Sequence, residues 1–235
     1  MHSFTLFFKV LFMSNNLKEQ TAQLQHIRQM MEQSSRFISL SGLSGIAAGT
    51  CALAGAYFAS GVINRSAGSS LKELDKHLYN GNLNVRDYMG NNLFLIALFT
   101  LIAAFILSAI FTWLRSKKTN TPIWGSASKR LLINVGIPMV AGGLYILKLI
   151  EHGSFGLIAP GCLIFYGLAL VNGSKYTLGE VRFLGYGQIM LGIINLWYTG
   201  YGLYFWAAGF GVLHIVYGAI MWSKYERKYP GKQLD

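Results

Sequence analysis

The chain has 235 residues, of which 53% are hydrophobic and only 12% are charged. A soluble domain carries about 25% charged residues, so this composition excludes an ordinary soluble fold. The mean hydropathy of +0.40 agrees with a membrane protein. The net charge is +11, but Lys and Arg gather at the ends of apolar runs. A nucleic-acid partner is therefore not expected, because such proteins carry their basic residues on one face.

The first predicted unit is a cytoplasmic N-terminal segment, residues 1–36. Its first 13 residues are apolar but too short to cross a bilayer, which needs about 20 residues. No small-x-small cleavage site follows them. They are either an interfacial segment or an over-extended start, so translation begins at Met1 or at Met13.

Residues 16–36 predict an amphipathic helix. Leu17, Leu24, Met31 and Ile38 recur every seven residues, which places them on one helix face. One interpretation is a membrane-surface helix that leads into the first span. The other is a docking helix for a second copy of the chain or for a cytoplasmic protein partner.

Residues 37–129 form the second predicted unit, a first hairpin. Its spans are 37–60 and 91–114, joined by a periplasmic loop at 61–90. Within that loop, Leu71, Leu74 and Leu78 indicate a short amphipathic helix. A basic cytoplasmic loop with a Pro122 turn follows at 115–129.

Small residues mark the first span as a packing helix. Ser41, Gly45 and Gly49 recur at four-residue spacing, as do three alanines, Ala48, Ala52 and Ala56. Such spacing lets helix backbones approach closely in lipid. We therefore expect this span to be central in the bundle and the leucine-rich second span to face lipid.

Residues 130–225 predict two further hairpins, written as an internal repeat. The four spans are 130–150, 155–172, 183–200 and 203–222. The pair Tyr166-Gly167 is echoed by Tyr217-Gly218, and Ser174-Lys175-Tyr176 by Ser223-Lys224-Tyr225. We expect three parallel hairpins, the last two related by an axis along the membrane normal.

Pro138 lies inside the third span. It has no N–H to donate to the carbonyl of Asn134, so a kink is expected there.

The Lys and Arg distribution predicts the orientation. With the N-terminus in the cytoplasm, 15 of these residues fall on the cytoplasmic side and 5 outside. The positive-inside rule then places both termini, including the tail 226–235, in the cytoplasm.

Intramembrane polar residues are the default functional candidates. Gln188 and Asn195 lie seven residues apart on one face of the fifth span, and His214 lies near the middle of the sixth. A Gln188–His214–Asn195 cluster is expected, either as a structural hydrogen-bond set or as a site for a solute, a proton or a lipid headgroup.

No catalytic residue, metal ligand or cofactor is predicted. The chain contains no H-E-x-x-H, G-x-S-x-G or P-loop motif. A haem held by two histidines would need a second mid-membrane histidine. Cys51 and Cys162 lie in apolar runs and are interpreted as small buried residues.

The run from Met30 to Gly45, MMEQSSRFISLSGLSG, resembles an uncharacterised family of six-span membrane proteins of Bacteroidota-type bacteria. The segments Arg130–Asn134, Gly156–Pro160, Ser174–Leu178 and Gly209–His214 carry the same resemblance. The hairpin pattern is also similar to the HdeD-like acid-stress membrane proteins. The first resemblance implies a six-span membrane fold, and neither implies an activity or a catalytic residue.

The sequence thus predicts an all-α bundle of six transmembrane helices in the bacterial inner membrane. The first functional hypothesis is a non-enzymatic regulatory, stress-related or scaffold protein that engages a partner through its cytoplasmic helix. The second is a small-solute or ion transporter or channel that uses the polar residues of spans five and six. A membrane enzyme is the least favoured of the three.

Overall fold

The computed structural model describes residues 41–66, 92–119 and 123–227, and this part of the chain is helical without a strand. The long helices are α2 (Gly42–Ser66), α5 (Asn92–Thr119), α6 (Ser126–Glu151), α7 (Ile158–Gly173) and α8 (Val181–Trp197). The segment Thr199–Arg227, called the last span below, joins η3 (Thr199–Tyr201), α9 (Gly202–Trp206), η4 (Ala207–Leu213), α10 (His214–Met221) and η5 (Trp222–Arg227). Two 3-10 turns flank α7, η1 (Phe155–Leu157) and η2 (Ser174–Tyr176).

Five of the described helical segments are long and apolar enough to cross a membrane. The sixth, α8, has 17 residues, close to the lower end of the usual range for a membrane span. Large apolar side chains such as Phe99, Phe105 and Ile137 are exposed along the outside of the bundle. An apolar exterior of this extent fits a bilayer as solvent.

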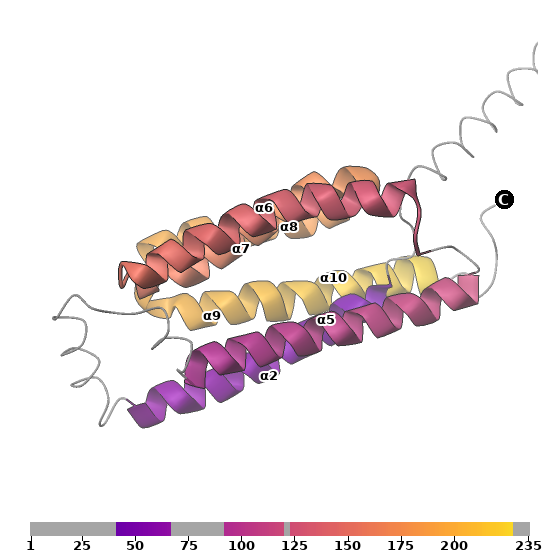
Figure 1. The fold of residues 1–235 in the computed structure, drawn as a ribbon. Coiled ribbons are helices and arrows are strands. Elements are labelled where there is room, and N and C mark those ends of the chain that lie inside the picture. Colours follow the sequence, from indigo (N-terminus) through magenta and orange to yellow (C-terminus); the bar gives the residue numbers. More distant parts are fainter. Residues whose placement is uncertain (1–40, 67–91, 120–122, 228–235) are drawn as a thin grey trace, which may run out of the picture.

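The helices lie in two layers (Figure 1). One layer contains α6, α7 and α8, with α7 packed between the other two. The second contains α5, α2 and the last span, with α2 between the other two. The layers meet where α7 and α8 contact α9 and η4.

Glycines on α2 and on the last span bring the two backbones into direct contact. A Cβ added at Gly45 would lie 3.2 Å from the α-carbon of Gly218, and one at Gly49 would lie 2.6 Å from the carbonyl oxygen of Gly211. Ala52 and Ala56 of α2 are buried as well. The predicted central packing role of the first span is confirmed.

The helices α7 and α8 use the same device. A Cβ at Gly167 would lie 2.7 Å from the carbonyl oxygen of Gly185, and one at Gly185 would lie 2.8 Å from that of Gly167. These two helices therefore pack at backbone distance, where dispersion contacts supply the association energy that lipid cannot.

The second span behaves as expected and faces outward. No part of the apolar window in α5 is buried, because this helix touches the rest of the described bundle through a single stripe directed at α2. The predicted boundaries of the basic loop 115–129 differ from those in the structure. The helix α5 continues to Thr119 and α6 begins at Ser126, so most of this loop is helical.

The hairpin prediction needs adjustment at the third pair. The pairs α2–α5 and α6–α7 pack side by side, as predicted. However, α8 packs most extensively on α7, and the last span packs most extensively on α2. Glycine contacts at backbone distance hold α8 to α7 and the last span to α2. The interface between α8 and the last span is therefore smaller than either of these two interfaces. The internal repeat stays a prediction.

A turn at Gly153 joins α6 to η1. This glycine has a φ of 68°, a left-handed conformation that side chains with a Cβ rarely adopt. The predicted helix 16–36, the short helix in 61–90 and most of the tail 226–235 lie outside the described residues.

Candidate functional site

His214 lies where the last span changes its winding. The preceding segment η4 is a π-helix, a form whose wider turn loosens the backbone hydrogen-bond ladder and often occurs at functional sites. The carbonyl oxygen of Gly209 lies 3.1 Å from Nδ1 of His214 and accepts a hydrogen bond of 2.8 Å from Nε2 of Gln188. A carbonyl oxygen has two lone pairs, so it can accept from both side chains.

The other imidazole nitrogen of His214 faces α7. Its Nε2 lies 2.8 Å from the hydroxyl oxygen of Tyr166. If Nδ1 carries the proton and donates to Gly209, then Nε2 accepts from the Tyr166 hydroxyl. Phe210 and Tyr166 also pack their rings on the imidazole. Both imidazole nitrogens thus have partners within the bundle.

The structure brings together two of the three predicted cluster residues. Gln188 and His214 are both buried, and Nε2 of Gln188 lies 3.4 Å from Nδ1 of His214. Asn195 is fully buried two turns further along α8, where its Nδ2 donates to the carbonyl of Tyr198 at 2.8 Å. Its role there is to close the end of α8, since it stabilises the turn into η3.

Three buried polar atoms in this region have no hydrogen-bond partner among the described residues: Oε1 of Gln188, Oδ1 of Asn195 and the hydroxyl of Tyr217. An unmade hydrogen bond of this kind costs about 1–3 kcal/mol. At Gln188 the oxygen lies against Gly209, where an added Cβ would be only 2.5 Å away. The His214 cluster (Gln188, Gly209, His214 and Tyr166) is therefore closely packed and carries one free acceptor.

A second intramembrane polar pair joins α6 to α7, and the sequence reasoning missed it. Nδ2 of Asn172 donates to the backbone carbonyl of Asn134 at 2.8 Å. That carbonyl lacks its usual helix partner because Pro138 has no N–H. Pro138 was the sequence signal for this contact, since the Asn134 carbonyl that it leaves without a partner needs another donor in a membrane. The helix α6 continues through Pro138.

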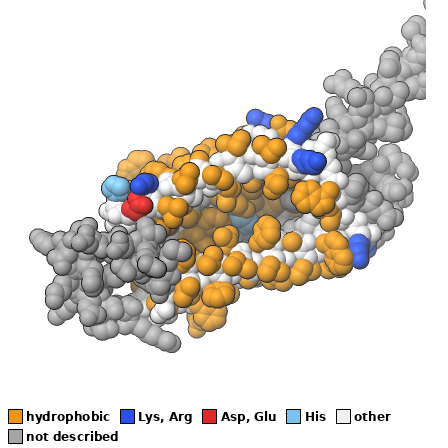
Figure 2. All heavy atoms as spheres, viewed as in Figure 1, with side chains coloured by type: hydrophobic (Ala, Val, Ile, Leu, Met, Phe, Trp, Pro, Cys, Tyr) orange, Lys and Arg blue, Asp and Glu red, His pale blue; other side chains and the backbone are white. Residues whose placement is uncertain are grey.

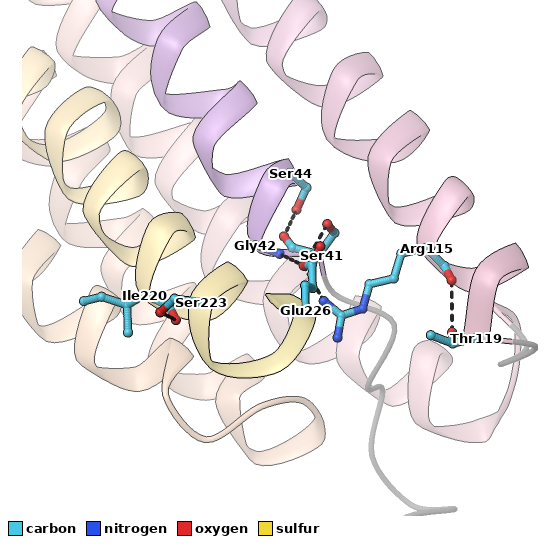
Figure 3. Close-up of polar contacts among 8 residues, drawn as sticks. All are labelled: Ser41, Gly42, Ser44, Arg115, Thr119, Ile220, Ser223 and Glu226. Atoms are coloured by element: carbon cyan, nitrogen blue, oxygen red, sulfur yellow. Dashed lines mark hydrogen bonds and ion pairs between the residues drawn. The ribbon is translucent and has the colours of Figure 1, made fainter. Parts of the chain in front are cut away.

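The charged end of the bundle holds a further constellation, called the Glu226 clamp here (Figure 3). Oε1 of Glu226 accepts hydrogen bonds from the backbone N of Gly42 at 2.6 Å and from Oγ of Ser41 at 3.1 Å. Arg115 donates to the same oxygen at 2.5 Å. Only 14% of the Arg115 side chain and 18% of the Glu226 side chain are exposed, so water screens this pair less than a surface pair.

The clamp joins three helix ends. Glu226 belongs to η5, Arg115 to the end of α5, and Gly42 to the first turn of α2. A carboxylate at a helix N-terminus is favourable because it meets unpaired N–H groups and the positive end of the helix dipole.

A neighbouring ion pair fixes the loop between α7 and α8. Lys224 donates to Oε1 of Glu180 at 2.5 Å, and the hydroxyl of Tyr225 donates to the same oxygen at 2.7 Å. Burial would raise the pKa of the Glu180 carboxyl, but these two hydrogen bonds outweigh it and lower the pKa to about 2. Glu180 is therefore ionised at neutral pH and ties its loop to η5.

The described residues contain no group of three His, Cys, Asp or Glu side chains that could hold a metal ion. Cys51 and Cys162 are both free thiols. Comparisons with protein-family models, with curated proteins and with solved structures find no match to this chain.

Proposed function

We propose that the chain is a non-enzymatic integral membrane protein that engages a cytoplasmic partner through the predicted helix 16–36. The observation that carries this proposal is the Glu226 clamp. The segment 16–36 ends five residues before Ser41, and Ser41 and Gly42 are held directly by Glu226. Anything that binds the segment therefore acts on the chain next to the clamp.

The clamp gives such binding a route into the bundle. If a partner pulls or rotates the chain before Ser41, the hydrogen bonds to Glu226 are the first to lengthen. Arg115 shares the same carboxylate oxygen, so the ends of α5 and η5 respond together. This arrangement suits a regulatory or scaffold protein, in which partner binding is reported through helix ends.

We further propose the bacterial inner membrane as the location, with both termini in the cytoplasm. The charge asymmetry supports this, because nine described Lys and Arg residues lie at the end that holds both Glu226 and Glu180. Reporter fusions at Lys118, Gly173 and Asp235 should report cytoplasm, and one at Gly81 should report the periplasm. A periplasmic Asp235 would overturn this topology.

The partner proposal is tested by capture from native membranes with matched variants. A Leu24→Glu/Met31→Glu double variant puts two charges on the apolar stripe of helix 16–36. An Ala22→Glu/Gln29→Glu variant has the same seven-residue spacing but places the new charges on the opposite face. A stable cytoplasmic partner should be lost from the first variant and kept by the control. Equal capture by both variants, or no partner with the unaltered chain, contradicts the proposal.

The second candidate function is a transporter or channel for protons or small solutes. It is favoured by the unpartnered Gln188 oxygen and Tyr217 hydroxyl near His214, since free polar atoms in a membrane mark candidate pathways. Proteoliposomes with a pH-sensitive dye test it. Proton flux that is abolished in His214→Leu while the melting temperature is kept would support this function, and flux equal to empty liposomes would remove it.

A further inference from the structure

A hollow lies between α5 and α6, on the face shown in Figure 2. It arises because these two consecutive helices belong to different layers. The helix α5 packs on α2, whereas α6 packs on α7. Figure 2 shows apolar side chains on both rims of this hollow. Such a space opens sideways to the bilayer, and its apolar rims suit an apolar occupant.

At one end, exposed basic side chains flank the hollow on both of its sides. Lys117 and Lys118 lie at the end of α5, and Lys129 and Arg130 lie at the start of α6. All four side chains are exposed, and Figure 2 shows Lys and Arg on both layers at this end. No carboxylate of the described residues forms an ion pair with any of them.

The carboxylates of the described residues already form ion pairs with other basic side chains. The described residues include three acidic side chains, and each is in an ion pair. Glu226 holds Arg115, Glu180 holds Lys224, and Glu151 holds Lys148 at the opposite end of the bundle. The four cations beside the hollow therefore favour an anion supplied from outside the described chain.

Aromatic residues place this end at the membrane interface. Trp113, in the last part of α5, lies under the ammonium group of Lys117 at 3.8 Å. Trp124, just before α6, is 72% exposed. Tryptophan is enriched at the level of lipid headgroups, so the four cations stand at the depth where phosphate groups lie.

We propose that the hollow between α5 and α6 holds one anionic phospholipid. Its phosphate lies between the basic ends of the two helices, and an acyl chain fills the space between them. Charge complementarity selects an anionic headgroup, and the apolar rims select a lipid over free phosphate. This site is independent of the partner-binding segment 16–36.

The test is native mass spectrometry of the full chain in mild detergent, with a Lys118→Gln/Arg130→Gln double variant. The unaltered chain should retain one phosphatidylglycerol in preference to phosphatidylcholine. Two headgroup contacts are removed in the variant, so its affinity for phosphatidylglycerol should fall by about thirtyfold. Inorganic phosphate should not compete at millimolar concentration.

A Lys175→Gln/Arg182→Gln variant is the matched control. It removes two charges from the same end of the bundle, but beside the tightly packed pair α7–α8. Its phosphatidylglycerol affinity should stay within about twofold of the unaltered chain. Equal losses in both variants would mean general attraction to a basic surface and would overturn the proposal. So would retention of phosphatidylcholine alone, displacement by inorganic phosphate, or a dimer without bound lipid, which would assign the hollow to a second copy.

Discussion

Backbone atoms of α2 and of the last span are in direct contact, and the substitution Gly218→Ala, which adds one methyl group, tests this contact. A Cβ at this position would lie 2.6 Å from the carbonyl oxygen of Gly42 and 2.6 Å from the amide nitrogen of Ile46. Both atoms belong to the backbone of α2, so no side chain can rotate away. To restore ordinary van der Waals contact, α2 would have to retreat by roughly 0.8 Å.

That retreat has a calculable cost. Overpacking a tight interface costs about 1–3 kcal/mol. We expect Gly218→Ala to lie near the middle of this range, because the same movement also loosens the contacts at Gly45 and Gly49. For a chain of this length each kcal/mol lowers the melting temperature by about 2–4 °C. The variant should therefore melt roughly 4–8 °C below the unaltered protein.

Thermal unfolding in detergent, followed by circular dichroism, measures the effect. Gly143→Ala is the matched control, because nothing lies within 4 Å of a Cβ at that position in α6. Replacing a mid-helix glycine by alanine should leave the melting temperature unchanged or raise it. If the two variants melt together, backbone contact between α2 and the last span does not hold the bundle.

Two further outcomes are expected. Asn172→Leu leaves the Asn134 carbonyl without a donor and should lower the free energy of unfolding by about 1 kcal/mol. In a Pro138→Ala background residue 138 regains its N–H, so the same substitution should cost less. An equal cost in both backgrounds would contradict the proposed role of Asn172. Glu180 has a pKa of about 2 in the folded protein. Its stabilising contact with Lys224 is therefore present above about pH 4.5 and is lost as the pH falls from there towards 2. Glu180→Gln should flatten the fall in melting temperature over that pH range, and an unchanged pH profile would contradict a stabilising role for this ion pair.

Local signals in the sequence predicted what depends on local geometry. The glycine and alanine spacing in the first span indicated close packing, because every small residue on one helix face points the same way. The proline at 138 indicated a freed carbonyl at Asn134 for a similar reason. Neither signal contains the identity of the partner. Only the tertiary arrangement shows that the last span lies opposite Gly45 and that Asn172 lies opposite Asn134.

The candidate site shows the same division. The position of His214 near the middle of its span could be counted from the sequence, and a cluster with Gln188 was expected there. The prediction for Asn195 rested on sharing a face with Gln188, but a shared face does not fix which neighbour lies within reach at each depth. The Glu226 clamp joins residues 185 positions apart. The π-helical winding that brings Glu226 to Ser41 has no periodic pattern in the sequence that would predict it.

The partner of α2 is also the last of the described helical segments to be made. About 170 residues separate Gly49 from Gly218, which at about 5–20 residues per second is roughly 10–30 s of synthesis. During that interval the glycine face of α2 has no helix against it and is open to lipid or to the insertion machinery. A chain interrupted before the last span would carry this face uncovered. Quality control in the membrane could therefore recognise an unfinished copy by its first span.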